Sequence, residues 1–286
     1  MDLILHSVYF TIFGIKIYMY GVMITLGILA GIGLAFWNYK RKGLSTNHIL
    51  NIGLIAIPSA IVGARIYYCV FFDKPYDFIS FIDITNGGLA VYGAIIGGAV
   101  AVFIYCLVKK INFLHVADCT VPSLAIGQCL GRIGCYFGGC CYGIQTDVQV
   151  FPFAVMIGDE WRLATFFYES FATLVICIML VVMLSKIKLK GFVFCAYFLL
   201  YGIARFFIEG VRGDSLYFLG LRVSQLLSLI LIVCSIAFII SLIFYYKKKG
   251  VLKEFFVYPK YLLKSTNNVN CNMQEKQNVD TEKEGE

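Results

Sequence analysis

The sequence predicts an all-α polytopic membrane protein with about seven transmembrane helices, its N-terminus outside and its C-terminus in the cytoplasm. Of its 286 residues, 60% are hydrophobic and only 14% are charged, whereas a soluble domain carries about 25% charged residues. The apolar residues fall into long runs, and lysine clusters follow every second run. This composition excludes an ordinary cytosolic enzyme, a disordered chain and a nucleic-acid-binding module.

Each apolar run has about the length that crosses ~30 Å of hydrocarbon at 1.5 Å per residue. The runs cover about residues 17–37, 49–72, 88–108, 119–137, 165–185, 192–208 and 223–246. We therefore expect one membrane domain over residues 17–249. An outer interfacial segment at 1–16 precedes it, and a cytoplasmic tail at 250–286 follows it. The tail is polar and is expected to be disordered from about residue 265.

Basic residues between the runs predict the orientation. Clusters such as Lys40-Arg41-Lys42 and Lys247-Lys248-Lys249 follow the first, third, fifth and seventh runs, whereas the other links carry isolated basic residues such as Lys74 and Arg162. Links rich in lysine and arginine remain in the cytoplasm. The net charge of +7 is therefore interpreted as an orientation signal.

Three arginines lie inside or at the edge of apolar runs, namely Arg65, Arg132 and Arg205. A charged residue at a helix centre opposes insertion by about 2.5–3.5 kcal/mol, and such residues usually face a polar interior. In the predicted orientation all three lie in the outer third of the membrane. Snorkelling to the nearest interface is the alternative, but it does not require all three to share one side. The pattern favours a common outward-facing site.

Tyr201, Arg205 and Glu209 are spaced by four residues, so they share one helix face. Guanidinium groups bind phosphate through two parallel hydrogen bonds and stay charged when partly desolvated. The phosphate of a lipid headgroup lies at this depth. We therefore hypothesise a phospholipid site that opens to the outer leaflet, in which Glu209 balances charge or moves a proton.

Six motifs in chain order resemble the prolipoprotein diacylglyceryl transferase family. Gly131-Arg132-Ile133-Gly134, followed by an aromatic residue and a glycine-rich turn, resembles the signature of that family. The other motifs are Tyr20-Gly21, Gly63-Ala64-Arg65-Ile66, the segment 86–93 with Gly88 and Tyr92, Tyr168-Glu169, and the segment 201–209. The resemblance covers about residues 15–246.

This resemblance implies that a diacylglyceryl group moves from phosphatidylglycerol to the lipobox cysteine thiol of a preprolipoprotein, releasing glycerol 1-phosphate. This reaction is the first step of lipoprotein maturation. The resemblance also implies a bacterial protein of the cytoplasmic membrane with its active site towards the outer leaflet. The implied partners are phosphatidylglycerol, the lipobox segment and membrane lipids. No cofactor, metal or nucleic acid is implied.

The resemblance also assigns roles to residues. It implies that Arg205, Glu209 and Tyr92 are catalytic. The implied substrate-binding residues are Arg132, Arg65, Tyr20, Tyr201, Gly88, Tyr168 and Glu169, with Arg132 on the phosphate.

The chain departs from the family pattern at several positions. Many members have histidine at the position of Tyr92, and a tyrosine with an unperturbed pKa of about 10 is a poor base near neutrality. Cys135 and Cys140 replace an asparagine and a glutamate. The group that removes the thiol proton therefore stays open between Tyr92, Glu209, Cys135 and the substrate's own surroundings.

Cys135, Cys140 and Cys141 have several interpretations. A metal is not expected, because the run lacks a second cysteine pair and a nearby histidine. A disulfide on the oxidising outer side, a covalent nucleophile and plain packing in a glycine-rich turn remain open.

Three other functions compete with the implied reaction. One is a related membrane transferase that moves a lipid group to a different acceptor. The others are a transporter or channel and a seven-helix receptor. A transport path needs polar groups that continue inward, but the inner half offers only Asp118, Asn51 and Ser59, without a chain of charges.

Overall fold

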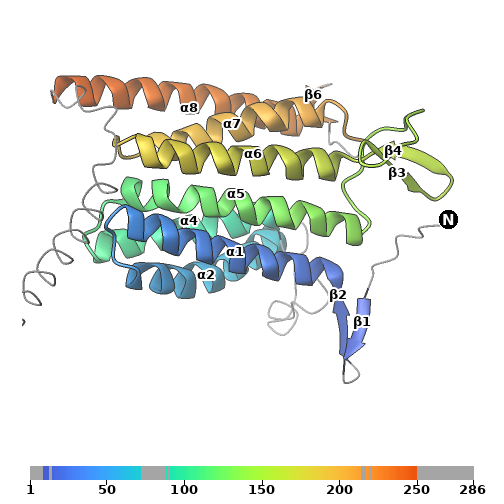
Figure 1. Ribbon diagram of the computed structural model, residues 1–286, viewed down its shortest axis with the longest axis horizontal. Helices are drawn as coiled ribbons and strands as arrows, with labels where there is room; N and C mark the ends of the chain where they lie inside the picture. The colour runs from blue at the N-terminus through green and yellow to red at the C-terminus, as the bar shows by residue number, and fades with distance from the viewer. Residues whose placement is uncertain are drawn as a thin grey trace, which may run out of the picture.

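The computed structural model describes residues 9–12, 15–71, 88, 90–213, 217–218 and 221–249. Within this part of the chain, seven helices lie side by side along one common direction (Figure 1). They are α1 (Met19–Arg41), α2 (Asn47–Phe71), α4 (Val91–Val108), α5 (Phe113–Phe137), α6 (Thr165–Lys186), α7 (Phe192–Glu209) and α8 (Val223–Lys248). All seven are long and apolar enough to cross a membrane. The predicted all-α polytopic class is confirmed.

Most helices begin and end within a few residues of the predicted runs, but α5 begins about six residues earlier, at Phe113. The side chain of Asn112 accepts a hydrogen bond of 3.2 Å from the backbone N–H of His115. An asparagine in this position satisfies an N–H that the first turn of a helix leaves unpaired. The polar residues His115 and Asp118 in the first turns interrupt the apolar run that the prediction relied on.

The helices pack in pairs, α1 on α5 and α2 on α4, and α5, α6, α7 and α8 follow one another in chain order (Figure 1). Glycines allow the closest approaches. A Cβ atom on Gly27 of α1 would lie 3.1 Å from the carbonyl oxygen of Gly127 in α5, and one on Gly97 of α4 would lie 2.5 Å from that of Ser59 in α2. Small residues at such crossings are typical of membrane helices.

Two hairpins lie at the end of the bundle where α1 and α6 begin (Figure 1). Strands β1 (Tyr9–Ile12) and β2 (Ile15–Tyr18) form the first, and β3 (Ala154–Ile157) and β4 (Glu160–Leu163) form the second. A short pair, β5 (Tyr217–Phe218) and β6 (Leu221–Arg222), precedes α8. The structure thus gives a hairpin for part of the predicted interfacial segment at 1–16. Residues 1–8 and the predicted tail at 250–286 lie outside the described residues.

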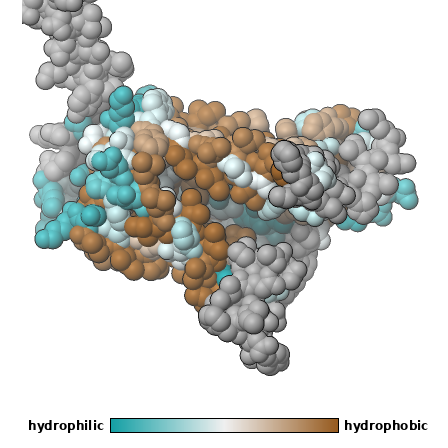
Figure 2. All heavy atoms as spheres, turned by 90° about the horizontal axis from the view of Figure 1, so that it is seen from below, coloured by the Kyte–Doolittle hydropathy of each residue, from teal (hydrophilic) through white to brown (hydrophobic). Residues whose placement is uncertain are grey.

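The opposite end of the bundle is hydrophilic, and a hydrophobic band covers the helices between the two ends (Figure 2). Basic residues occupy the last turns of α1, α6 and α8, at Lys40 and Arg41, Lys186, and Lys247 and Lys248. The basic clusters therefore share one end, as the alternation of basic links predicted.

Candidate functional site

Four charged side chains from three helices meet near the end of the bundle that carries the hairpins. Arg132 comes from α5, Glu169 from α6, and Arg205 and Glu209 from α7. The Nε atom of Arg132 lies 2.6 Å from one carboxylate oxygen of Glu169, and Nη1 of Arg205 pairs with the other oxygen. The side chain of Glu169 is only 5% exposed. A single buried carboxylate therefore orients both arginines.

Glu209 forms the second half of this network and is almost completely buried. Its carboxylate lies 3.0 Å from Nη2 of Arg205 and 4.0 Å from Nη1 of Arg212. Its backbone carbonyl accepts a hydrogen bond from Arg222. The four-residue spacing of Arg205 and Glu209 predicted a shared helix face, and their ion pair confirms it.

Within the described part of the chain, three arginines contact the two glutamates of this network. The side chains of Arg132 and Arg205 keep 24% and 16% of their surface exposed. A buried charge is tolerated only when it is paired, and the carboxylate of Glu169 pairs with two arginines at once. The exposed parts of these two guanidinium groups can contact an anionic group.

The loop after α5 brings a thiol to the same arginines. Nη1 of Arg132 lies 3.5 Å from Sγ of Cys141, and Nη2 of Arg212 lies 3.3 Å from it. Hydrogen bonds from the thiols of Cys135 and Cys140, together with the two guanidinium charges, hold the pKa of Cys141 well below its ordinary value, although burial opposes this. The sequence did not predict the contact between Cys141 and Arg212. The only signal was Arg212 itself, one turn beyond Glu209.

Hydrogen bonds to the start of α6 and to the end of β4 fix this loop. The hydroxyl of Thr165 at the start of α6 donates to the carbonyl of Cys141 at 2.8 Å. The N–H of Gly143 donates to Leu163 at 2.8 Å. A Cβ atom on Gly143 would lie 2.7 Å from the Cβ of Leu163, so only glycine fits there. The position of Cys141 is therefore set by its surroundings.

Comparison with known proteins identifies the family of this site. The model of the family described as Prolipoprotein diacylglyceryl transferase matches residues 7–241. The chain belongs to the prolipoprotein diacylglyceryl transferase family. The resemblance seen in the six motifs is confirmed.

Three relatives, each called phosphatidylglycerol–prolipoprotein diacylglyceryl transferase, illustrate the similarity. The protein of Clostridium botulinum (strain Langeland) is 40% identical over 248 residues, covering 84% of this chain and 98% of the relative. That of Finegoldia magna is 41% identical over 251 residues, covering 86% and 97%. That of Clostridium kluyveri is 40% identical over 242 residues, covering 82% and 95%.

Three tyrosines in the diacylglyceryl transferase motifs have different surroundings. Tyr20 of α1 packs beside the last turn of α5, since a Cβ atom on Gly134 would lie 3.2 Å from its ring. Tyr201 precedes Arg205 by one helical turn and stacks on Tyr197 with ring centres 5.9 Å apart. Tyr168 is half-buried, and its hydroxyl donates to the carbonyl of Phe153 at 2.6 Å. Their substrate-binding roles stay predictions.

The remaining family positions lie on α2 and at the start of α4. Nη1 of Arg65 donates to the carbonyl of Gly88 at 3.0 Å. Gly88 has a φ of 76°, and a Cβ atom there would meet the side chains of Arg65 and Tyr68. Tyr92 is 53% exposed, and its ring centre lies 6.3 Å from that of Tyr67. These contacts join α2 to α4. The roles of Arg65, Gly88 and Tyr92 stay predictions.

Proposed function

We propose that this chain transfers the diacylglyceryl group of phosphatidylglycerol to the lipobox cysteine thiol of preprolipoproteins, releasing glycerol 1-phosphate. The observation that carries the proposal is the pair of partly exposed arginines, Arg132 and Arg205, held by the one carboxylate of Glu169, in a chain that belongs to the family. The names of the relatives state the same donor and the same class of acceptor.

The charge of the network suits the proposed reaction. The acceptor thiolate attacks the carbon of the diacylglyceryl unit that is bonded to the phosphodiester oxygen, and a C–S bond forms. The C–O bond breaks, and its electron pair stays on the phosphate oxygen of the leaving group. The phosphodiester carries one negative charge and the departing phosphomonoester carries up to two. Fixed cations aimed at this growing charge stabilise the transition state.

In this proposal Arg132 and Arg205 have different roles. Arg132 binds the phosphate of phosphatidylglycerol, and Arg205 positions the headgroup and stabilises the leaving phosphate. Glu169 orients both guanidinium groups, and Glu209 balances the charge of Arg205. We further propose that Tyr20, Tyr168, Tyr201, Arg65 and Gly88 contact the substrates and that Tyr92 hydrogen-bonds the headgroup.

The proposal also places the protein in the cell. Seven membrane-spanning helices and bacterial relatives support a multi-pass membrane protein. We assign it to the cytoplasmic membrane with its basic end inside, because basic links remain in the cytoplasm. The arginine network then faces the outer leaflet. Residues 17–249 form the transferase domain in this assignment, between the N-terminal segment and the cytoplasmic tail.

A transfer assay with two acceptor peptides tests the function. Detergent-solubilised protein receives phosphatidylglycerol labelled in its diacylglyceryl group and either a lipobox peptide or the same peptide with its cysteine changed to serine. We expect label on the cysteine peptide alone, with release of glycerol 1-phosphate. Glycerol phosphate release without labelling of either peptide would instead indicate a related transferase with a different acceptor. If a diacylglyceryl transferase relative works in parallel while this protein consumes no lipid, the proposal fails.

A further inference from the structure

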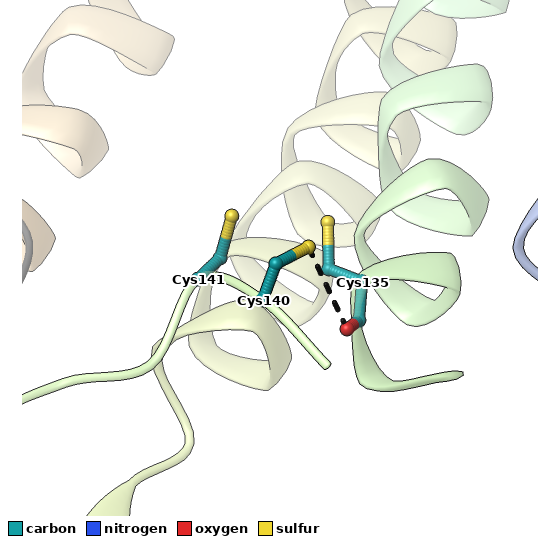
Figure 3. Close-up of side chains that lie close together, drawn as sticks. All are labelled: Cys135, Cys140 and Cys141. Carbon is teal, nitrogen blue, oxygen red and sulfur yellow. Dashed lines mark hydrogen bonds between the residues drawn. The ribbon is translucent and has the colours of Figure 1, made fainter. Parts of the chain in front are cut away.

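Three thiols converge beside the arginine network. Cys135 lies in the last turn of α5, and Cys140 and Cys141 follow in the loop (Figure 3). Their sulfur atoms all lie within 4.8 Å of one another, and all three are free thiols. The side chains of Cys135 and Cys141 point the same way, and that of Cys140 turns toward Cys135, whose carbonyl accepts a hydrogen bond from its thiol at 3.7 Å (Figure 3).

The backbone is shaped to bring these thiols together. The N–H of Cys140 donates to the carbonyl of Cys135 at 3.1 Å, which turns the chain back over the helix end. Cys141 has a φ of 63°, a left-handed conformation that is unfavourable for a non-glycine residue. The hydrogen bond from Thr165 to the carbonyl of Cys141 holds this conformation. The convergence of the three thiols is therefore built into the loop.

The surrounding charges match a metal bound to three thiolates. Three thiolates and one divalent cation sum to a single negative charge. Arg132 and Arg212 direct N–H groups at the sulfur of Cys141, at 3.5 and 3.3 Å, and supply the compensating positive charge. Donors of this kind commonly orient and tune the ligands of a metal site.

We infer that Cys135, Cys140 and Cys141 bind one zinc ion and leave its fourth position open. The sequence-based expectation of no metal assumed four protein ligands. Structural zinc sites use four, but catalytic zinc sites use three protein ligands and keep one position for water or substrate. Thiolate ligands favour zinc over magnesium, calcium and manganese.

The next step rests on the proposed transferase function. The open position on the zinc ion suits the lipobox thiol of the acceptor. The acceptor sulfur would displace a water, bind zinc and lose its proton to solvent, because a metal-bound thiol is deprotonated. The resulting thiolate forms the C–S bond as the C–O bond of phosphatidylglycerol breaks. Arg132 contacts both Cys141 and Glu169, so the thiol position would adjoin the phosphate position. Cys135 and Cys140 would then serve as metal ligands in place of the usual asparagine and glutamate.

Metal binding is tested first, independently of activity. Full-length protein in detergent, reduced with a phosphine that contributes no thiol, is titrated with Zn²⁺ and with Cd²⁺, whose thiolate charge-transfer absorption reports sulfur ligands. We expect one ion per chain with a three-thiolate signature. Cys140→Ser and Cys141→Ser should lose it. Cys234→Ser, which removes an exposed thiol of α8, should retain it. Wild-type protein without bound metal, or equal binding by the Cys140→Ser variant, would overturn the inference.

The open position is tested with the acceptor. Adding the lipobox peptide to the Cd²⁺-loaded protein should increase the thiolate absorption, whereas the serine peptide should not. No increase would refute the role of the fourth position. In the transfer assay, metal-depleted protein should lose labelling and regain it with Zn²⁺. Normal labelling by metal-free protein would refute the catalytic role of the metal while leaving the transferase function intact.

Discussion

Arg132 and Arg205 both pair with the buried carboxylate of Glu169, so the orientation of each guanidinium group is fixed before a substrate binds. The guanidinium group of an arginine can donate parallel hydrogen bonds to two phosphate oxygens, whereas the ammonium group of a lysine acts as a point charge. The positive charge alone would attract the lipid phosphate, but guanidinium groups of fixed orientation are needed to stabilise the leaving group. The pairing with Glu169 therefore has consequences that single substitutions can measure.

The first substitution is Arg132→Lys, which keeps the positive charge and removes the pair of parallel N–H donors. Transfer of label to the lipobox peptide should fall by about two orders of magnitude, the usual loss when one directed donor is removed from a transition-state site. The assay is run at matched protein levels in membranes. Undiminished transfer by this variant would argue against a phosphate role for Arg132.

The second substitution is Glu169→Gln, which removes the shared carboxylate charge. Arg132 and Arg205 should lose their common orientation, and transfer should fall by about a hundredfold, the effect of a small misplacement at a reacting centre. Glu160→Gln is the matched control, because Glu160 pairs with Arg162 at 2.9 Å on the exposed hairpin. Equal activity of the two variants would refute the orienting role of Glu169.

At this scale the sequence predicted which charged residues would meet, while their roles stay predictions. The cost of inserting a charge singled out Arg65, Arg132 and Arg205, and the four-residue spacing from Arg205 singled out Glu209. The structure brings Arg132, Arg205 and Glu209 into one network, whereas Arg65 contacts the carbonyl of Gly88. The contact of Cys141 with Arg212 was not predictable, because it joins residues 71 positions apart through a loop whose path depends on α6 and α7.

Among the elements, α5 supplies both Arg132 and an anchor for α7 at its opposite end. The buried carboxylate of Asp118 accepts hydrogen bonds from the N–H groups of Gly191 and Phe194, at 2.6 and 2.7 Å. It therefore caps α7 from a neighbouring helix, in the place of a side chain from α7 itself. This cap fixes α7, which carries Arg205 and Glu209.

Asp118→Ala should lower the free energy of unfolding by about 1–2 kcal/mol, because it leaves the N–H groups of Gly191 and Phe194, at the start of α7, without their acceptor. The thermal unfolding midpoint in detergent should fall by a few degrees. Asp147→Ala, in the exposed loop before β3, is the control and should leave the midpoint unchanged. If both variants unfold at the wild-type temperature, Asp118 is not an anchor.

Hydropathy predicted where the helices lie but missed the short strands. The pair β3 and β4 reverses at Gly158, which has a φ of 60°. A Gly-Asp pair between short strands is a hairpin signal, but four-residue strands are too short to stand out among long apolar runs.

For the whole molecule, the separation of charge between the two ends determines which way it sits in the membrane. The proposed orientation predicts that Asp159→Cys, in the turn between β3 and β4, reacts with a membrane-impermeant maleimide on intact cells. Lys249→Cys, at the end of α8, should react only after permeabilisation. The unmodified chain gives the background from its native thiols. The reverse pattern would place the arginine network on the cytoplasmic side.

The most direct measurement compares transfer of the labelled diacylglyceryl group to the lipobox peptide by wild-type protein and three arginine variants. Arg132→Ala and Arg205→Ala each remove one cation from the network around Glu169. Arg162→Ala removes one from the exposed hairpin, where the side chain is 40% exposed. We expect the first two variants to lose transfer and the third to keep it. Transfer that persists in Arg132→Ala and Arg205→Ala would contradict the assignment of the network as the phosphate site.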